Sequence, residues 1–176
     1  MLKMADDYSS NVVAFVRFAS SGAVTTYGDK TGLFDWTGAG NAAQVVEGDA
    51  LTGSYLSLDG AGDYLYTPGR PGFRLGPGAF VIDFGLKTST PGGAILDYKM
   101  DTDGYQISLD YPSGQITFWN GRSYVKTSTI SVTDGIRRHI AFARSADGTL
   151  RIFINGVLDG STTNAFNYNA DVSIMA

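Results

Sequence analysis

The sequence predicts an all-β protein whose short antiparallel strands form a sandwich or a barrel. Three features indicate this class: many glycines, almost no glutamate, and an alternation of apolar and polar residues. Glycine provides 23 of the 176 residues, about twice its usual share, which is typical of a chain with many tight turns. Glu47 is the only glutamate among 17 acidic residues, and aspartate favours turns whereas glutamate favours helices.

The first 53 residues carry weaker signals than the rest of the chain. We expect residues 1–10 to form a flexible N-terminal arm and residues 11–176 to form a single β-sandwich domain. Residues 12–18 are apolar on both faces, which is typical of a buried strand. Residues 19–53 are rich in glycine, threonine, alanine and aspartate, and we expect a long ordered loop there with one or two short strands.

From residue 54 onward, apolar and polar residues alternate with the period of two that marks a half-buried strand. Within residues 79–87, for example, one face holds only apolar side chains, namely Phe80, Ile82, Phe84 and Leu86. The predicted strands cover residues 54–58, 63–67, 79–87, 94–99, 105–111, 115–119, 122–126, 138–144, 149–154 and 157–159.

Four dipeptides between these strands are strong hairpin signals, because asparagine, aspartate and glycine tolerate the positive φ angles of a tight turn. They are Asp103-Gly104, Asn120-Gly121, Asp147-Gly148 and Asn155-Gly156. We therefore expect an antiparallel meander in the second half of the chain.

Charge and cysteine content exclude several functions. The formal net charge of −4 argues against nucleic acid as a partner, because phosphate binding needs a basic surface. Without cysteine the chain has no disulfide, no thiolate zinc site and no cysteine nucleophile. Its N-terminal segment lacks the apolar core of a signal peptide, and no apolar run reaches the length of a membrane span, so we expect no membrane insertion.

Three stretches in this order resemble a known family. They are SYLSLDGAGDYLYTP with the following GPGAFVIDFGLKT (54–88), the hairpin series from ILDYK through ITFWNG (95–121), and RRHIAFARSADGTLRIFINGVLDGS (137–161), which is the most specific. The order is similar to that of laminin-G-like, concanavalin A-like domains, above all the variants found in bacteriophage virion proteins. The resemblance covers roughly residues 11–176.

The resemblance implies an antiparallel two-sheet jelly-roll sandwich, with a concave face and loops at one rim. It also implies a non-enzymatic component of a phage virion: a capsid decoration, a fibre or a tail-associated module, made in the host cytoplasm. Its partners would be other virion proteins and glycans. Two alternatives stay open, a calcium-dependent carbohydrate-binding module of a bacterial surface protein and, more remotely, a glycoside hydrolase.

The C-terminal end departs from the family pattern. Such domains usually close with a Gly-aromatic-hydrophobic-Asp-x-hydrophobic-Arg strand, whereas this chain stops at DVSIMA (171–176). An unpaired strand edge promotes aggregation. We therefore expect either a longer natural protein or a closing strand supplied by a neighbour, such as another copy of the chain.

Four aromatic residues are candidates for glycan binding, because sugars stack their C–H faces on aromatic rings. Trp119 ends one predicted strand and Tyr124 starts the next, while Tyr64 and Tyr66 share a face of residues 63–67. Packing within a sheet, or contact with another protein, explains exposed aromatics equally well.

Calcium is the one metal for which the sequence offers ligands, although no cofactor is required. Asp59 and Asp63 bracket a Gly-Ala-Gly turn, and Asp101 and Asp103 form a second short cluster. Calcium takes six to eight oxygen ligands and accepts irregular loops. Aspartate also serves turns by local hydrogen bonding, which is the alternative interpretation of both clusters.

The sequence predicts no catalytic residue. Asp97 and Asp101 are the best carboxylate pair for glycoside hydrolysis, but Asp101 falls in a turn signal and the Glu-x-Asp-x-x-Glu pattern of glucanases is missing. His139, the only histidine, lies within the predicted strand 138–144 without a nearby nucleophile motif, so a structural or interfacial role is expected.

Overall fold

The protein is described by a computed structural model in which the chain divides into two compact units. The first unit comprises residues 1–68 and Met175, and the second comprises residues 69–174 and Ala176. The structure describes residues 26–28, 35–46, 54–67, 73–98, 103–169 and 174–175. The expected N-terminal arm and the expected strand 12–18 lie outside these ranges. In the described ranges, no helix has the length and apolarity needed to cross a membrane.

Five strands lie in the described part of residues 1–68. Strands β1 (Thr26–Gly28), β2 (Asp35–Ala39) and β5 (Tyr64–Thr67) pair in that order, and β3 (Ala43–Val46) pairs with β4 (Ser54–Ser57). All these pairs are antiparallel. The described residues of the region 19–53 thus form three strands where we expected one or two. Strands β1 and β2 show no alternation of apolar and polar residues, so only their pairing reveals them.

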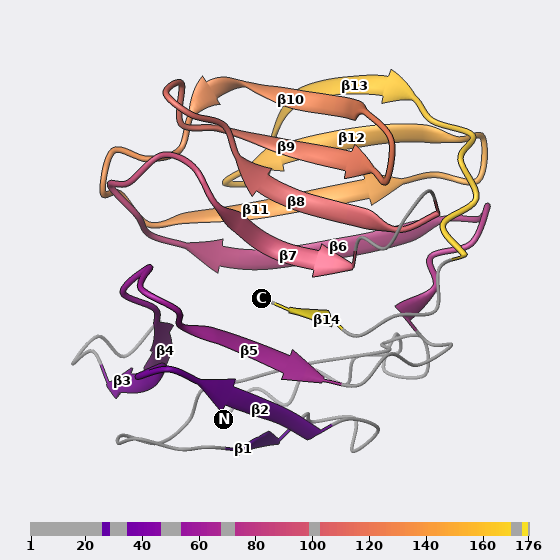
Figure 1. The fold of residues 1–176 in the computed structure, drawn as a ribbon. Helices are drawn as coiled ribbons and strands as arrows, with labels where there is room; N and C mark the ends of the chain where they lie inside the picture. The colour runs from indigo at the N-terminus through magenta and orange to yellow at the C-terminus, as the bar shows by residue number, and fades with distance from the viewer. Residues whose placement is uncertain are drawn as a thin grey trace, which may run out of the picture. The chain divides into compact units, whose positions relative to one another are not determined.

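The second unit is a sandwich of two antiparallel sheets, which confirms the predicted all-β fold (Figure 1). Sheet A contains β7 (Ala94–Tyr98), β8 (Tyr105–Leu109), β9 (Gln115–Asn120) and β10 (Tyr124–Ser131). Sheet B contains, in spatial order, β13 (Val157–Thr163), β12 (Thr149–Ile154), β11 (Arg138–Arg144) and β6 (Phe80–Leu86). A last short strand, β14 (Ile174–Met175), ends the described residues.

Aromatic side chains fill the space between sheets A and B. Phe118 of β9 is completely buried and lies against Phe80 and Phe142 from sheet B, at ring-centroid distances of 5.9 and 5.5 Å. Tyr105 of β8 stacks on Phe118 at 6.1 Å with nearly parallel rings. Tyr168, which follows β13, meets Phe118 edge-on at 5.6 Å. These contacts place one aromatic cluster at the centre of the sandwich.

The side chains of β6 confirm the predicted alternation. Val81, Asp83 and Gly85 are exposed, while the residues between them are turned toward the core and only partly accessible. Val81 is 67% exposed because it lies on the outer face of sheet B. A single strand therefore presents opposite chemistry on its two faces, as the period-two pattern requires.

Two of the predicted turns differ in how they are built. At Asn155-Gly156, between β12 and β13, both residues have positive φ, 52° and 77°, as a two-residue hairpin turn requires. At Asn120-Gly121 the asparagine acts through its side chain instead. Its Oδ1 accepts hydrogen bonds from the backbone N–H groups of Arg122, at 3.1 Å, and Ser123, at 2.8 Å.

Strand β10 is longer than predicted and β8 is shorter. The sequence predicted a strand over 122–126, but β10 runs to Ser131 through polar residues that show no apolar alternation. Asp159 of β13 stabilises that extension, because its carboxylate accepts bonds from the N–H and the hydroxyl of Thr129 at 2.7 and 2.6 Å. Strand β8 ends at Leu109 because Asp110 already starts the turn, where its C=O accepts from Gly114 N–H.

A buried arginine connects two segments of the second unit. The Arg144 side chain, only 2% exposed, donates to the carbonyl oxygens of Gly76, Gly78 and Phe166 at 2.6 to 2.8 Å. It also reaches Asn164 Oδ1 at 3.3 Å. All four acceptors are neutral oxygens, so dipoles rather than a carboxylate stabilise this cation. Burial lowers the pKa of the guanidinium, which is otherwise far above neutrality.

Two buried tyrosines predict a loss of stability in alkaline solution. Burial raises the pKa of Tyr168 to about 12, and it raises the pKa of Tyr105 even further, with Tyr98 adding to the effect. An unfolded tyrosine titrates near about 10. Both tyrosines have a higher pKa in the folded protein than in the unfolded chain, so their neutral hydroxyls favour folding. This contribution to stability is complete below about pH 10 and is lost as the pH rises toward the pKa values of the folded protein.

We expect the melting temperature to fall between about pH 10 and 12, and to fall less steeply in Tyr168→Phe. This variant keeps the ring but loses the hydroxyl that donates to Asn164 Oδ1 at 2.7 Å, so it should also melt lower at pH 8. Thermal melts at pH 8, 10 and 11, compared with the wild type, measure both effects. Parallel pH curves for the two proteins would show that Tyr168 ionisation is not linked to folding.

Candidate functional site

The outward face of sheet A carries a row of four side chains, one from each strand. The register pairs Asp97 of β7 with Gln106 of β8, Gln106 with Trp119 of β9, and Trp119 with Tyr124 of β10. Their chain neighbours Tyr98, Tyr105 and Phe118 point into the core and are buried. Because side chains alternate along each strand, the four residues face away from the core. We call them the cross-strand row.

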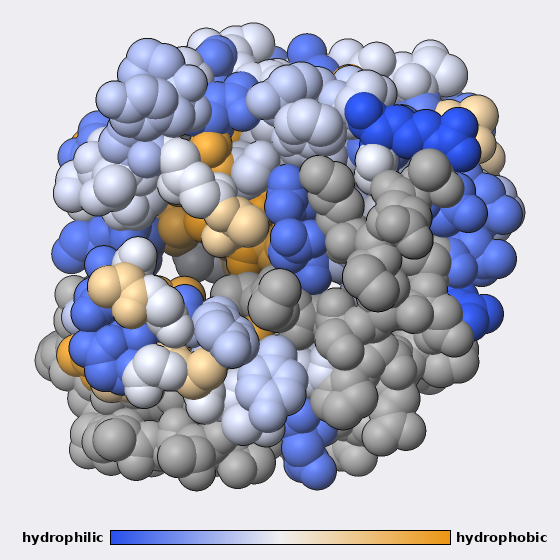
Figure 2. All heavy atoms as spheres, viewed as in Figure 1, coloured by the Kyte–Doolittle hydropathy of each residue, from blue (hydrophilic) through white to orange (hydrophobic). Residues whose placement is uncertain are grey.

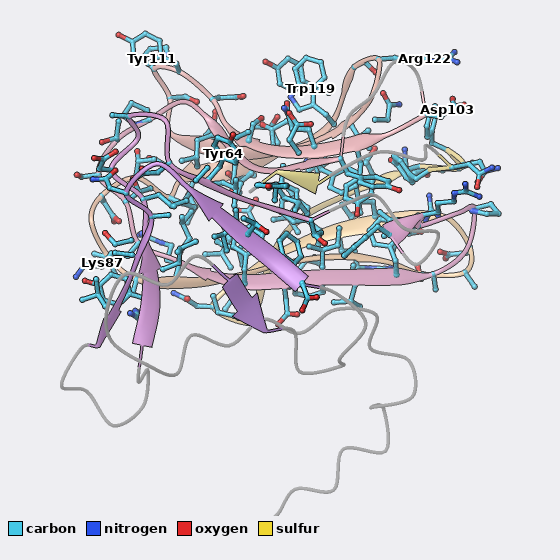
Figure 3. All side chains as sticks on the ribbon, turned by 60° about the horizontal axis from the view of Figure 1, so that its bottom comes forward. Tyr64, Lys87, Asp103, Tyr111, Trp119 and Arg122 are labelled. Carbon is cyan, nitrogen blue, oxygen red and sulfur yellow. The ribbon has the colours of Figure 1, made fainter. Side chains whose placement is uncertain are left out.

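The aromatic end of the cross-strand row is a close ring pair. The centroids of Trp119 and Tyr124 are 3.9 Å apart, with the ring planes inclined at 45°. Tyr124 is 57% exposed, and Trp119 is partly exposed. In Figure 3 the Trp119 ring stands out from the sheet. Two adjacent rings of this kind offer an apolar platform with hydrogen-bonding edges, the indole N–H and the phenol hydroxyl.

The polar end of the cross-strand row is held by a hydrogen bond. Gln106 Nε2 donates to Asp97 Oδ2 at 2.9 Å, so the carboxylate and the carboxamide orient each other. The same bond fixes which way the Gln106 amide points, with its oxygen turned from Asp97. Gln106 also lies directly beside Trp119 in the ladder. The row therefore passes from acceptors at one end to aromatic rings at the other.

Short side chains make up the next row of the same face. Ser108 pairs with Thr117, and Thr117 pairs with Thr127, whose hydroxyl lies 2.9 Å from that of Thr117. Thr117 is fully buried in this row, whereas Ser108, Thr127 and Trp119 are partly exposed. The surface over β10 and β13 is mostly hydrophilic, as the blue and white atoms at the top of Figure 2 show.

The β9–β10 turn lies beside the aromatic pair and carries a cation. Arg122 is mostly exposed; its guanidinium lies 5.9 Å from the centre of the Phe166 ring and 3.9 Å from the Asp103 carboxylate. Asp103, one of the predicted calcium residues, is thus a neighbour of this arginine. Asp101, its predicted partner, lies outside the described residues.

One exposed aromatic was missed by the sequence analysis. Tyr111 was expected within a strand over 105–111, but it lies in the β8–β9 turn and is 80% exposed. Figure 3 shows its ring beyond the end of the strands, on the side of sheet A from which Trp119 projects. The signal that was available is the turn-forming sequence Pro112-Ser113-Gly114 directly after it.

The other two predicted aromatic candidates belong to the first unit. Tyr64 and Tyr66 of β5 share an exposed face, as predicted, and are 38% and 39% exposed. Their ring centroids are 6.1 Å apart, much further than in the Trp119–Tyr124 pair. Two of the four candidates thus belong to the first unit and two to the second.

Asp59 and Asp63 lie together at one turn, as the sequence suggested, and both carboxylates accept hydrogen bonds there. Asp59 accepts from Ala61 N–H at 2.7 Å and from Asn41 Nδ2 at 3.0 Å. Asp63 accepts from the backbone N–H groups of Asn41, at 2.7 Å, and Asp59, at 2.9 Å. The bonds from Ala61 and Asn41 lower the pKa of Asp59. This geometry matches aspartates that shape a turn.

Each of the four carboxylate oxygens at this turn has an N–H partner, so a calcium ion would have to compete with those donors. Within the described ranges, no three residues among His, Cys, Asp and Glu lie close enough to hold a metal ion. Calcium binding at Asp59 and Asp63 stays a prediction.

The single histidine makes a polar pair on the outer face of sheet B. His139 Nε2 lies 2.9 Å from Asp83 Oδ2, and both side chains are more than half exposed. His139 shares its face with Ala141 and Ala143, as predicted from the alternation. Alanine has no nucleophilic group, so these two neighbours of His139 add nothing to catalysis. The exposed His139–Asp83 pair is suited to a contact at the protein surface.

Comparison with protein families assigns the fold. Residues 59–174, well over half of the chain, match the laminin-G-type group of the concanavalin A-like lectin/glucanases superfamily. The chain belongs to this superfamily. The resemblance inferred from the hairpin series is thereby confirmed at the level of the superfamily, while an origin in a phage particle stays a prediction. Among curated protein sequences, a search finds no match to the chain.

Solved structures with the same fold include clostridial toxin domains. The binding domain of Paraclostridial mosquitocidal protein 1 superposes with a TM-score of 0.72 at 13% identity, over 91% of this chain and 43% of that one. A structure of botulinum neurotoxin type C, a toxin whose cell entry depends on interaction with two ganglioside molecules, gives 0.68 at 15% identity over 94% and 43%.

The binding domain of botulinum neurotoxin DC in complex with rat synaptotagmin II gives 0.65 at 14% identity over 93% and 43%. This superfamily member thus spans less than half the length of these chains. At such identities the likeness establishes the fold and leaves ligands and partners open.

Proposed function

We propose that this chain is a non-enzymatic carbohydrate-binding module, and that its glycan stacks on Trp119 and Tyr124. The observation that carries the proposal is the ring pair itself, with centroids 3.9 Å apart on the outward face of sheet A. Apolar rings that face solvent next to hydrogen-bonding groups are the usual means of holding a sugar ring, whose faces are apolar and whose edges are polar.

The superfamily and the similar structures support a binding role. The superfamily includes lectins, and the type C neurotoxin interacts with gangliosides, which carry glycans. The mosquitocidal and DC toxin structures are both binding domains. These points concern other proteins, and for this chain they make glycan binding the first hypothesis to test.

The carboxylates of sheet A argue against glycoside hydrolysis. Retaining and inverting glycosidases need two carboxyl groups on either side of the scissile bond. In the described strands of sheet A, the cross-strand row contains one carboxylate, Asp97, and its row neighbour is the amide of Gln106. An amide neither attacks nor protonates a glycosidic bond, so the row is suited to holding a sugar.

We expect Trp119→Ala to weaken glycan binding by about tenfold or more, because loss of an aromatic anchor costs about 2 kcal/mol and each 1.4 kcal/mol is a factor of ten. A glycan array with the purified chain, followed by calorimetry on the best glycan, measures this. Tyr124→Ala should show a smaller loss, since that ring supports Trp119 from one side.

Val81→Ala, at an exposed position on the outer face of sheet B, is the control and should leave the affinity unchanged, whereas a loss of affinity in Tyr64→Ala would point to the other predicted aromatic pair. Running the array in Ca²⁺ and again in EDTA tests the calcium-dependent alternative, in which Asp59 and Asp63 would hold the ion. An array without any selective binding would contradict the proposal and would favour a role in protein assembly.

We further propose that the module is carried on the surface of a phage particle, as a capsid decoration, fibre or tail-associated domain beside other virion proteins. Support comes from the order of the sequence motifs in residues 54–161 and from the absence of cysteine. Mass spectrometry of purified particles tests this setting, and particles that lack the chain would contradict it.

A further inference from the structure

We infer that the ligand of sheet A is a linear oligosaccharide that extends along the strands from Trp119 to Tyr111, where Tyr111 provides a second aromatic contact. This inference rests on the proposed function, because Trp119 is the first contact of the same ligand. It adds the length of the glycan, its direction on the sheet and the residue that binds its far end. Three features support it: the exposure of Tyr111, the rigidity of its turn and the side chains between the two rings.

Tyr111 is the most exposed large apolar side chain in the described ranges, with 80% of its surface accessible. It lies in the turn between β8 and β9, and its ring is on the side of sheet A from which Trp119 projects (Figure 3). A tyrosine combines an apolar ring face with a polar hydroxyl edge, as the ring pair of the proposed site does. The same kind of contact is therefore present twice on one side of the sheet.

Backbone hydrogen bonds hold the turn that carries Tyr111. Gly114 N–H donates to Asp110 O at 2.8 Å, which closes the turn on itself. Gly114 O accepts from Val132 N–H at 2.9 Å, which ties the turn to the segment that follows β10. A ring on a fixed backbone loses less conformational entropy on binding than a ring on a mobile loop. Tyr111 is thus mounted in the way that a ligand contact requires.

The two rings are too far apart for a single sugar ring. Gln106 of β8 pairs with Trp119 of β9, and Tyr111 follows Gln106 by five positions. At about 3.4 Å per residue along β8, with the last two residues already in the turn, the rings are mounted about 15 Å apart. A sugar ring is about as wide as the aromatic ring on which it stacks, so only a chain of several linked rings contacts both ends.

Side chains with hydrogen-bonding groups occupy the outward positions between the two rings. Ser108 and Thr127 are partly exposed, and they flank Thr117, which is buried. Gln115, one step nearer to the turn, is partly exposed too, and its amide is oriented by the bond from Nε2 to Ser128 O at 2.7 Å. Hydroxyl and amide groups both donate and accept, as sugar hydroxyls do. The middle of a glycan chain can therefore form hydrogen bonds while its ends stack.

Calorimetry with linear oligosaccharides of increasing length tests the inference. The probes are the β-1,4-linked series of glucose, N-acetylglucosamine and xylose and the α-1,4-linked series of glucose, each from the monosaccharide to the hexasaccharide. In a series that binds, we expect the affinity to rise by about tenfold or more between the disaccharide and the longest chain. This gain is the size expected for one further aromatic contact.

The variant that isolates the second contact is Tyr111→Ala. It should lower the affinity for the longest chain by about tenfold and so remove the dependence on length, whereas Trp119→Ala should weaken binding at every length. Tyr111→Phe keeps the ring and should keep most of the gain. Val157→Ala is the matched control: it removes another exposed apolar side chain, 69% accessible, at the start of β13 in sheet B, and it should bind as the wild type does.

The outcomes separate this inference from the proposed function. An affinity that does not depend on length, or a gain that persists in Tyr111→Ala, overturns the inference and leaves the ring pair as the site. An equal loss at every length in Tyr111→Ala also overturns it, because Tyr111 would then contact the same sugar as Trp119 or hold the ligand alone. Binding of single-ring or branched glycans only, with none of the linear series bound, overturns the inference alone, whereas absence of any glycan binding overturns both.

Discussion

Replacing Arg144 with lysine is expected to lower the free energy of unfolding by about 3 kcal/mol or more, because the change keeps a buried charge and removes some of its hydrogen bonds. The guanidinium uses three nitrogens to reach four acceptors, which lie in segments 76–78 and 164–166. A lysine ammonium has three donors at one point and cannot cover acceptors spread around a planar fork.

Arg144 also lies over two aromatic faces, with its guanidinium carbon 4.7 Å from the Phe80 ring centre and 5.2 Å from that of Tyr168. Arg144→Met removes the charge but leaves the buried carbonyl oxygens without donors, so it should be destabilising as well. Thermal and urea unfolding of both variants measure the effect. A change of about 3 kcal/mol corresponds to a decrease of about 6–12 °C in melting temperature for a chain of this size.

Arg122→Met provides the matched control, since that arginine is mostly exposed and surface substitutions usually change stability by less than about 0.5 kcal/mol. Hydrogen exchange adds a local test: the Gly76 and Tyr168 amides, which bond to each other's carbonyls at 3.0 and 3.2 Å, should lose protection in Arg144→Lys. Wild-type melting and unchanged protection at these amides would show that Arg144 does not connect the two segments.

Most of the strands of the second unit were predictable because two local signals agree there. The strands predicted over 79–87, 138–144 and 149–154 correspond to β6 (80–86), β11 (138–144) and β12 (149–154). Each has clear alternation and is bounded by a turn sequence, so pattern and turn chemistry indicate the same ends. Such agreement makes a strand visible without knowledge of its partner.

The remaining elements depend on contacts that are distant in the sequence. The polar extension of β10 is stabilised by Asp159, thirty positions away, and β2 pairs with β5, more than twenty positions away. Arg144 is a charged residue at a position where the alternation requires an inward side chain. Only acceptors far along the chain, such as Gly76 and Asn164, explain why burial is tolerated there.

The aromatic half of the site was predicted and the polar half was not. The Asn120-Gly121 signal put Trp119 at the end of one strand and Tyr124 at the start of the next, and the register pairs the two residues. The turn at residues 110–115 sets the pairing of β8 with β9, and counting outward from it places Gln106 opposite Trp119. The pairing of Asp97 with Gln106 could not be counted from the sequence in the same manner, because the sequence that connects β7 and β8 does not mark one tight turn from which the register follows.

Truncation of Phe118 to alanine is expected to lower the free energy of unfolding by about 3–5 kcal/mol, as for other buried aromatic residues. The ring is fully buried and touches aromatic rings from both sheets and from the segment after β13. Removing it opens a cavity at the centre of the aromatic cluster, and the surrounding strands cannot collapse into it without breaking their pairing. Urea unfolding at neutral pH measures the change.

Because a loss of this size is a large share of the stability of a small domain, Phe118→Leu provides a second variant. It fills most of the volume and loses the ring contacts, so we expect a smaller destabilisation of about 1–2 kcal/mol. The adjacent Trp119→Ala serves as the control on the opposite face of the same strand. It should abolish most glycan binding and change the melting temperature little, whereas Phe118→Leu should bind glycan normally at temperatures where it is folded.

The opposite effects expected at Phe118 and Trp119 follow from the alternation of side chains along β9. Measuring both effects tests the fold and the site together. If Trp119→Ala proved as destabilising as Phe118→Leu, the indole would be part of the packing of sheet A rather than a surface for ligands. If Phe118→Leu weakened binding without changing stability, the core would be transmitting a shape change to the outer face. Only the crossed result, stability lost at one position and binding at the next, fits a rigid sheet with a packed inner face and a binding outer face.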